Sequence, residues 1–231
     1  MTLVINVLHK DFSLLAADRQ ANANGPTTIT AGGLTINLSN GGTITGLFPK
    51  VITTANCTAA VGSAGTIAEH TYLAPFKAAK TAEVGLDAVR DAAYGFFNFT
   101  ERERFLGGEG QMINSSITSF FDVEKDSFWS FVISYTRFVF SQDVYARKAN
   151  ATAQIFSVGS GHDTLTKKID GEEIERFTAS IAESWSEPEL AQWLERCFEN
   201  VSAENKSVGD TYDAFIATRA DPLFRPLVRS P

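Results

Sequence analysis

The first eighteen residues combine a hydroxyl nucleophile with a carboxylate at the spacing of a hairpin. The chain begins MTLVINVLHKDFSLLAAD, so Thr2 follows Met1 and Asp18 ends the second of two apolar runs. Once Met1 is removed, a threonine offers both an attacking hydroxyl and an α-amine, whose ordinary pKa of about 7.7 to 8.0 suits a general base. A lysine and a carboxylate would set the charge around the hydroxyl, and a backbone N–H at a glycine turn would hold the oxyanion.

The elements that must position these groups begin with a hairpin. Leu3, Ile5 and Val7 alternate with residues of the opposite face, which predicts a strand buried on at least one face. A polar turn follows, and Phe12 to Ala17 predicts the returning strand. The range 22–46 is rich in Gly, Thr and Asn, which predicts a second, protruding hairpin with turns at 32–33 and 40–42.

The rest of the chain alternates strand-like and helix-like segments. The predicted strands cover 50–52, 57–61, 113–121, 128–140, 153–158 and 213–217. A break at 62–65 precedes the first of four predicted helices, which cover 66–80, about 86–105, 171–183 and 188–201. Ser186 is the expected cap of the last helix, and Pro188 lies in its first turn. This order predicts one α+β domain over 1–231, in which two antiparallel sheets face each other and helix pairs cover the outside.

Composition limits the function classes. Hydrophobic residues make up 44% and charged residues 20% of the chain, as in ordinary globular domains. The net charge of −7 argues against binding a nucleic-acid backbone. Cys57 and Cys197 lie far apart, without metal-ligand spacing, and no apolar run has the length of a membrane helix. We therefore expect a soluble cytoplasmic protein with no cofactor, no nucleic-acid partner and no membrane partner.

Six motifs in order resemble those of proteasome-type β subunits. They are Thr2 itself, LLAADRQANA around Asp18, FPKVI around Lys50, AVGSAGTIAE around Gly65, SVGSGHD around Ser160, and ENKSVGDTYDAFIA with Glu204 and Ser207. In its length and in the absence of a propeptide before Thr2, the chain is most similar to the bacterial proteasome homologue of betaproteobacteria. The ancestral-β-subunit type and the HslV peptidase are close competitors.

The resemblance implies a fold and a role for each matched residue. The fold would be the four-layer αββα sandwich of N-terminal-nucleophile hydrolases. Thr2 would be nucleophile and base, Asp18 and Lys50 would tune it, and Gly65 would donate the oxyanion N–H. The outer network that orients the threonine amine would consist of Ser160, Glu204 and Ser207. The positions near the specificity pocket would be Arg19, Gln20 and Ser63.

The resemblance also implies an activity and an assembly. The protein would be a self-compartmentalising threonine endopeptidase that cleaves peptides or unfolded protein. It would form a homo-oligomeric ring, two stacked heptamers making a tetradecamer, supplied by an unfoldase or adaptor. Two alternatives stay open on the same fold: a catalytically silent ring-forming scaffold, and an N-terminal-nucleophile amidase that acts on small amides.

The chain departs from the family pattern at three places. The segment between Asp18 and Lys50 is longer than usual, Glu204 stands where an aspartate is usual, and Val208 interrupts an expected Ser-Gly. Gly62 is an alternative oxyanion residue. His162 beside Asp163 is a second candidate for catalysis, although no G-x-S-x-G nucleophile motif accompanies it.

Overall fold

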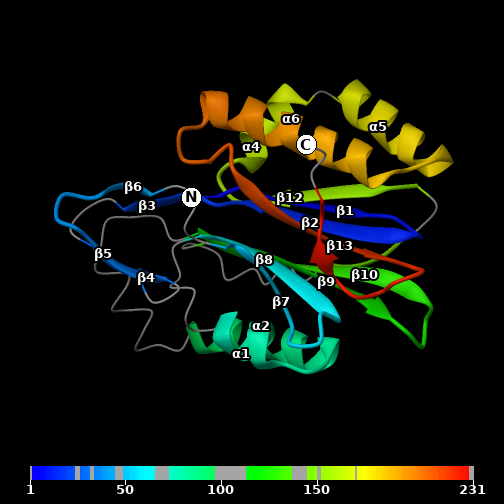
Figure 1. Ribbon diagram of the computed structural model, residues 1–231, viewed down its shortest axis with the longest axis horizontal. Helices are drawn as coiled ribbons and strands as arrows, with labels where there is room; N and C mark the ends of the chain where they lie inside the picture. Colours follow the sequence, from blue (N-terminus) through cyan, green and yellow to red (C-terminus); the bar gives the residue numbers. More distant parts are fainter. Residues whose placement is uncertain are drawn as a thin grey trace.

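The structure, a computed structural model, belongs to the α+β class that the sequence predicts. It describes residues 2–23, 27–31, 34–44, 49–65, 73–96, 113–136, 145–149, 152–169 and 171–228. Two five-stranded antiparallel sheets face each other, and helices lie on the outer side of each sheet (Figure 1). Within the described residues, no helix is long and apolar enough to cross a membrane.

The predicted N-terminal hairpin is confirmed, and it forms the centre of the first sheet. The strands of this sheet, in spatial order, are β12 (Gln154–Val158), β1 (Val4–Leu8), β2 (Phe12–Asp18), β13 (Tyr212–Thr218) and β14 (Arg225–Pro226). Val4 pairs with Val158 on one side and with Ala17 on the other, and Tyr212 pairs with Asp18. The start of β1, the ends of β2 and β12, and the start of β13 therefore meet at one end of the sheet.

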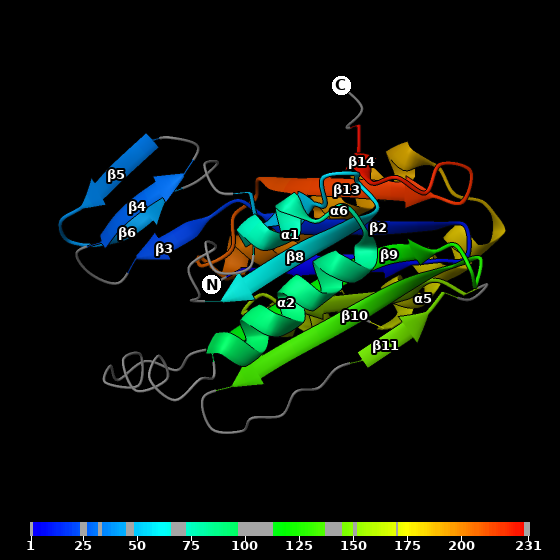
Figure 2. The same ribbon diagram turned by 90° about the horizontal axis from the view of Figure 1, so that it is seen from below.

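The second sheet brings a further chain segment to that end. Its strands, in spatial order, are β11 (Tyr145–Lys148), β10 (Ser127–Thr136), β9 (Ile113–Asp122), β8 (Ala59–Gly65) and β7 (Val51–Thr53). Val51 pairs with Gly62, so the residue before β7 lies near the last residues of β8. Figure 2 shows the N-terminus beside the end of β8.

The helices cover the two sheets from outside. Three of them, α4 (His162–Lys168), α5 (Gly171–Glu183) and α6 (Glu187–Glu204), lie on the first sheet, and α1 (Leu73–Ala78) and α2 (Ala82–Phe96) lie on the second (Figure 1). Ser186 is the N-cap residue of α6 as predicted, but its hydroxyl donates to the carboxylate of Glu189 at 2.8 Å and accepts no hydrogen bond from a backbone N–H of the helix. The guanidinium of Arg225 donates to Glu187, which holds the pKa of that carboxyl below its usual value and ties β14 to α6.

Three apolar cores fill the spaces between these layers. The side chains of β1 belong to two of these cores, because Ile5 and Val7 pack toward α6 while Val4 and Leu8 pack toward the second sheet. The hairpin is thus buried on both faces. The third core lies between the second sheet and α1 and α2, and it contains Val61 and Phe76.

A buried polar cluster joins the two sheets inside the apolar core between them. Asn6 of β1 accepts a hydrogen bond from Ser130 of β10 at 2.8 Å, and Ser13 of β2 is bonded to Ser119 of β9 at 2.6 Å. All four side chains are fully buried. Because unpaired polar groups are costly in such a place, these bonds favour one alignment of the two sheets.

The long segment between Asp18 and Lys50 forms a ribbon of paired strands. At its root, β3 (Ala21–Ala23) pairs with β6 (Gly42–Ile44), and further out β4 (Thr27–Ala31) pairs with β5 (Leu34–Leu38). Both views show these strands projecting from the end of the sheets that holds the N-terminus (Figures 1 and 2). The turn predicted at 32–33 lies outside the described residues.

The break predicted at 62–65 is wrong. These residues belong to β8, a strand paired on both sides. A Cβ on Gly62 would lie 2.6 Å from a methyl group of Val4, so the small residues allow the sheets to approach closely and do not end the strand. Three short elements were not predicted: β11, β14 and α4, each of at most seven residues. The predicted ranges 66–72, 97–105 and 137–140 lie outside the described residues.

Candidate active site

Thr2 lies two residues before the start of β1 and is held by the turn that follows β12. Its main-chain N–H donates to Oγ of Ser160 at 3.2 Å, and its carbonyl accepts from the N–H of Gly161 at 3.3 Å. Gly159, with φ at +98°, makes this turn possible, because a Cβ there would collide with the carbonyl oxygen of Thr2. Thr2 is only 2% exposed.

Asp18 is the last residue of β2, and its fully buried carboxylate accepts hydrogen bonds from three main-chain N–H groups. Oδ1 accepts from the main-chain N–H of Leu3 at 2.8 Å, and Oδ2 accepts from those of Gln20 at 3.1 Å and Gly209 at 3.2 Å. A buried charge needs such compensation to be tolerated. The carboxylate thereby holds three backbone segments, at Leu3, Gln20 and Gly209, and Oδ2 also accepts from a cation.

That cation is Lys50, the residue directly before β7. Its Nζ donates to Oγ1 of Thr2 at 2.6 Å, to Oδ2 of Asp18 at 3.0 Å, and to the carbonyl oxygen of Gln20. An ammonium has three N–H donors, so each has an acceptor. The Lys50 residue is 6% exposed, and its backbone is held by a hydrogen bond from the N–H of Ser63 to its carbonyl at 2.9 Å. A buried positive charge therefore touches the threonine hydroxyl.

A second set of hydrogen bonds runs outward from the nitrogen of Thr2. Oγ of Ser160 lies 3.2 Å from Oγ of Ser207. Asn205 holds both serines, because its amide nitrogen donates to the carbonyl of Ser160 at 2.9 Å and its Oδ1 accepts from the N–H of Ser207 at 3.1 Å. The hydroxyl of Ser207 also donates to Oδ1 of Asn205.

Glu204, which the family resemblance assigns to this network, lies outside it. Its side chain is 52% exposed and forms an ion pair with Lys168 of α4. The neighbouring Asn205 holds Ser160 and Ser207 instead. One signal in the sequence pointed to Asn205: an asparagine at the end of a helical pattern is a common cap, and its side chain is then free to bond the following turn.

Gly65 and Ser63 lie on β8, whose final residues approach the Thr2 segment. A Cβ on Gly159 would meet both the carbonyl of Thr2 and the Cβ of Ala64, 2.8 Å away, so the end of β8 and the Thr2 segment are neighbours. Gly65 pairs with Asn114 of β9 and is the last residue of the strand. Ser63 is partly buried.

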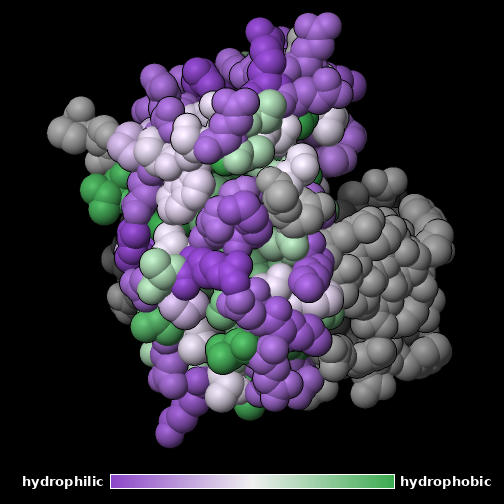
Figure 3. Space-filling model, turned by 90° about the vertical axis from the view of Figure 1, so that its right-hand side faces the viewer, coloured by the Kyte–Doolittle hydropathy of each residue, from purple (hydrophilic) through white to green (hydrophobic). Residues whose placement is uncertain are grey.

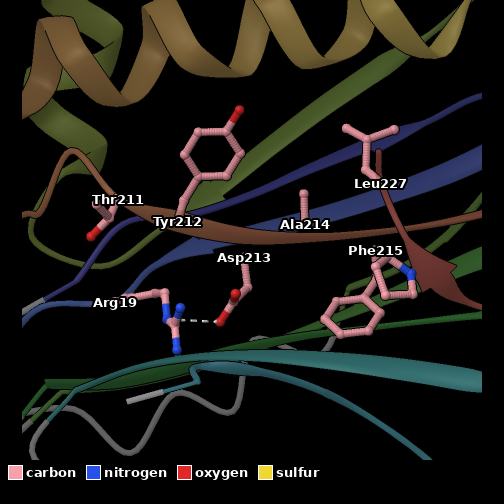
Figure 4. A pocket seen from close by; sticks show the side chains of 8 residues that line it. Arg19, Thr211, Tyr212, Asp213, Ala214, Phe215 and Leu227 are labelled. Atoms are coloured by element: carbon pink, nitrogen blue, oxygen red, sulfur yellow. Dashed lines mark ion pairs between the residues drawn. The ribbon is translucent and has the colours of Figure 1, made fainter. Parts of the chain in front are cut away.

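Arg19 lines a pocket whose lining residues do not include Thr2. Its Nε pairs with Asp213 at 3.4 Å, and the two side chains point toward each other below β13 (Figure 4). The pocket has a volume of about 450 Å³ and follows the outer edge of β13 toward Phe215 and Leu227.

Gln20 is occupied by structural contacts and does not face an open site. Its side-chain nitrogen donates to the carbonyl of Lys206 at 2.6 Å and to Oδ1 of Asn22 at 3.2 Å, while its own carbonyl accepts from Lys50. His162 begins α4, where its Nδ1 lies 2.7 Å from Oγ of Ser157 and not in the Thr2 network.

Comparisons with known proteins do not identify a family for this chain. No protein-family model matches the chain, and no curated protein matches it. Among the described residues, no three His, Cys, Asp or Glu side chains are grouped so that they could hold a metal ion.

The contrast between Asn205 and Glu204 predicts a measurable difference. If Thr2 is the nucleophile of a peptidase, Asn205→Ala should lower peptide turnover about tenfold, the effect of about 1.4 kcal/mol of lost hydrogen bonding, because Ser160 and Ser207 lose their common support. Glu204→Ala removes an exposed ion pair and should leave turnover unchanged. Equal effects of the two substitutions on peptide turnover would contradict the network.

Proposed function

We propose that this protein is a threonine peptidase of the N-terminal-nucleophile type, in which Thr2 attacks once Met1 has been removed. The observation that carries the proposal is the position of the Lys50 ammonium, 2.6 Å from the Thr2 hydroxyl and 3.0 Å from Asp18. A lysine that bridges a threonine hydroxyl and a buried carboxylate favours negative charge on that hydroxyl. A threonine with a purely structural role would not require a buried ammonium beside its hydroxyl.

The reaction proceeds through an ester on Thr2. The free α-amine takes the hydroxyl proton while Oγ1 attacks the substrate carbonyl carbon, and Lys50 stabilises the negative charge on Oγ1. The tetrahedral intermediate, its oxyanion held by the N–H of Gly65, then expels the amine half of the substrate, which leaves with the proton. A water molecule, deprotonated by the same amine, cleaves the ester and regenerates Thr2.

Ser160, Ser207 and Asn205 position the base in this mechanism. In the proposed enzyme the nitrogen bonded to Ser160 is the α-amine, and the serine-asparagine network keeps its lone pair directed at the hydroxyl proton. None of these side chains is ionised. The network therefore orients the amine without adding a charge that would favour its protonated form.

The proposal extends to fold and assembly. We infer that the two sheets and their helices are the four-layer αββα sandwich of N-terminal-nucleophile hydrolases, and that copies form a ring, two stacked heptamers, which encloses the Thr2 sites. Such a chamber takes unfolded chains from an unfoldase or adaptor. The support for this part is the order of the sequence motifs together with the facing sheets.

Two alternatives make different demands on the same site. A silent scaffold does not need the Lys50 bridge, and burying an ammonium without using it costs free energy. An amidase for small amides needs the bridge but also an enclosed pocket fitted to its substrate.

The test is a digestion in which one enzyme preparation meets two kinds of substrate. We expect cleavage of a denatured, reduced protein into short peptides, with slower or no hydrolysis of single amino-acid amides. Cleavage of small amides with intact denatured protein would favour the amidase. No cleavage of either, by protein whose Met1 is shown to be absent, would favour the scaffold.

A further inference from the structure

Gln20 is bonded through its backbone to the ion pair beside the Thr2 hydroxyl. Its main-chain N–H donates to Oδ2 of Asp18 at 3.1 Å, and its carbonyl accepts from Nζ of Lys50. The residue is only 6% exposed, although glutamine is usually a surface residue. Both main-chain groups of Gln20 therefore help to hold the two charges in place.

The side chain of Gln20 contacts the other hydrogen-bond network of the site, through the turn that follows α6. Its amide nitrogen donates to the carbonyl of Lys206 at 2.6 Å. Lys206 lies between Asn205 and Ser207 in the chain. Both of these neighbours are bonded to Ser160. One residue thus joins the ion pair to the serine-asparagine network.

Asn22 makes a second, parallel link to the same turn. Its side-chain nitrogen donates to the carbonyl of Ser207 at 3.1 Å. Its Oδ1 accepts from the amide nitrogen of Gln20 at 3.2 Å and from Oγ1 of Thr43 at 2.8 Å. The two amide side chains therefore support each other, and each donates to a main-chain carbonyl of the turn.

The turn is packed directly against Gln20. A Cβ on Gly209 would lie 3.0 Å from the Cβ of Gln20, so the two backbones approach more closely than a larger residue would permit. The N–H of Gly209 also donates to Oδ2 of Asp18 at 3.2 Å. The position of the turn is consequently determined by its contacts with the segment from Asp18 to Asn22.

We propose that Gln20 is a positioning residue of the peptidase, which fixes the serine-asparagine network relative to the Lys50–Asp18 ion pair. The network orients the nitrogen of Thr2, and Lys50 contacts its hydroxyl. Proton transfer between these two groups depends on how their supports are oriented, and a misplacement of about 1 Å can cost about a hundredfold in rate. This inference rests on the proposed function, to which it adds a residue that acts through its neighbours.

The test removes the amide of Gln20 and keeps the length of its side chain. Steady-state cleavage of a peptide would be measured for the parent, Gln20→Met and Asn22→Ala. We expect Gln20→Met to lower kcat about tenfold, as for the loss of one buried hydrogen bond, and to leave KM within about twofold of the parent value. Asn22→Ala should lower kcat in the same way, and it keeps the inference testable if Gln20→Met fails to fold.

Gln154→Met is the matched control. The side-chain nitrogen of Gln154 donates to the carbonyl of Lys148 at 3.2 Å, so this variant loses the same kind of bond. Gln154 pairs with Leu8, at the end of the first sheet opposite Thr2. Figure 3 views the molecule from that end, where the described surface is mainly hydrophilic, with apolar side chains scattered among polar ones. We expect the kcat and KM of Gln154→Met to equal those of the parent.

Hydrogen exchange, followed by mass spectrometry, gives a readout that does not depend on activity. The main-chain N–H groups of Ser207 and Gly209 are bonded to side chains of Asn205 and Asp18. In Gln20→Met these two groups should exchange about tenfold faster than in the parent, because the turn opens more often. In the control variant their exchange should not change.

Two results would overturn the inference. A raised KM with the kcat of the parent would assign Gln20 to substrate binding, and parent values of both kcat and exchange would remove it from the mechanism. A parent that cleaves no peptide would overturn the proposed function instead. The exchange rates would then still decide whether Gln20 holds the turn, and rates equal to those of the parent would overturn that link as well.

Discussion

Replacing Thr2 with alanine should abolish peptide cleavage while leaving the fold and the assembly unchanged. The substitution removes Oγ1, the atom that Lys50 contacts at 2.6 Å, and loss of a covalent nucleophile reduces turnover by at least about 10⁴-fold. The fold should tolerate the change because the main-chain bonds of Thr2 to Ser160 and Gly161 remain available. The measurement is the single-turnover rate on a peptide that the parent cleaves.

Thr2→Ser is the matched control. It keeps the hydroxyl and the amine and removes only a methyl group, so it should retain part of the activity and remain sensitive to covalent inhibitors. Full turnover by Thr2→Ala, with the assembly of the parent, would mean that another residue is the nucleophile.

Removing the ammonium of Lys50 should lower turnover by at least about a hundredfold, the scale of losing one preorganised electrostatic group. Lys50→Met keeps the length of the side chain, and Lys50→Ala removes it. Lys50→Arg should not restore turnover, because a planar guanidinium cannot occupy the place of a compact ammonium between Thr2 and Asp18. The measurement is kcat for peptide cleavage in each variant.

Folding must be separated from chemistry in this series. Asp18 is fully buried, and removal of its cation leaves an unpaired charge, which costs about 3–5 kcal/mol of stability. The double variant Lys50→Met/Asp18→Asn leaves neither charge and should recover much of the stability without the activity. If this double variant, well folded, cleaved peptides at the parent rate, Lys50 would have no part in the chemistry.

The sequence predicted the core of this arrangement where local pattern decides structure. Two apolar runs, Leu3 to Leu8 and Phe12 to Ala17, separated by a short polar turn, predict a hairpin. A hairpin necessarily brings Thr2 and Asp18 to the same end. The runs of aromatic and β-branched residues likewise predicted the strands β9, β10 and β12.

Tertiary contacts decided what the sequence could not show. Gly62 to Gly65 has the composition of a turn, but close approach of the facing sheet, through Val4 and Leu15, makes small residues suitable for a strand. Lys50 could be matched to the family motif by the residues beside it but not by its distance along the chain from Asp18. The ribbon accounts for the additional residues between the two. Glu204 and Asn205 are adjacent on the chain, and only the exit direction of α6 determines which of them reaches Ser160.

The most direct test of the central claim is mass spectrometry of the natively expressed protein before and after reaction with a peptide epoxyketone. This reagent captures a hydroxyl and an amine on the same residue, so it reports the free N-terminal threonine that the mechanism needs. We predict a chain that lacks Met1 and one covalent adduct, mapped to Thr2 and absent from Thr2→Ala. Peptide cleavage by a chain that retains Met1, or an adduct on another residue, would contradict the account.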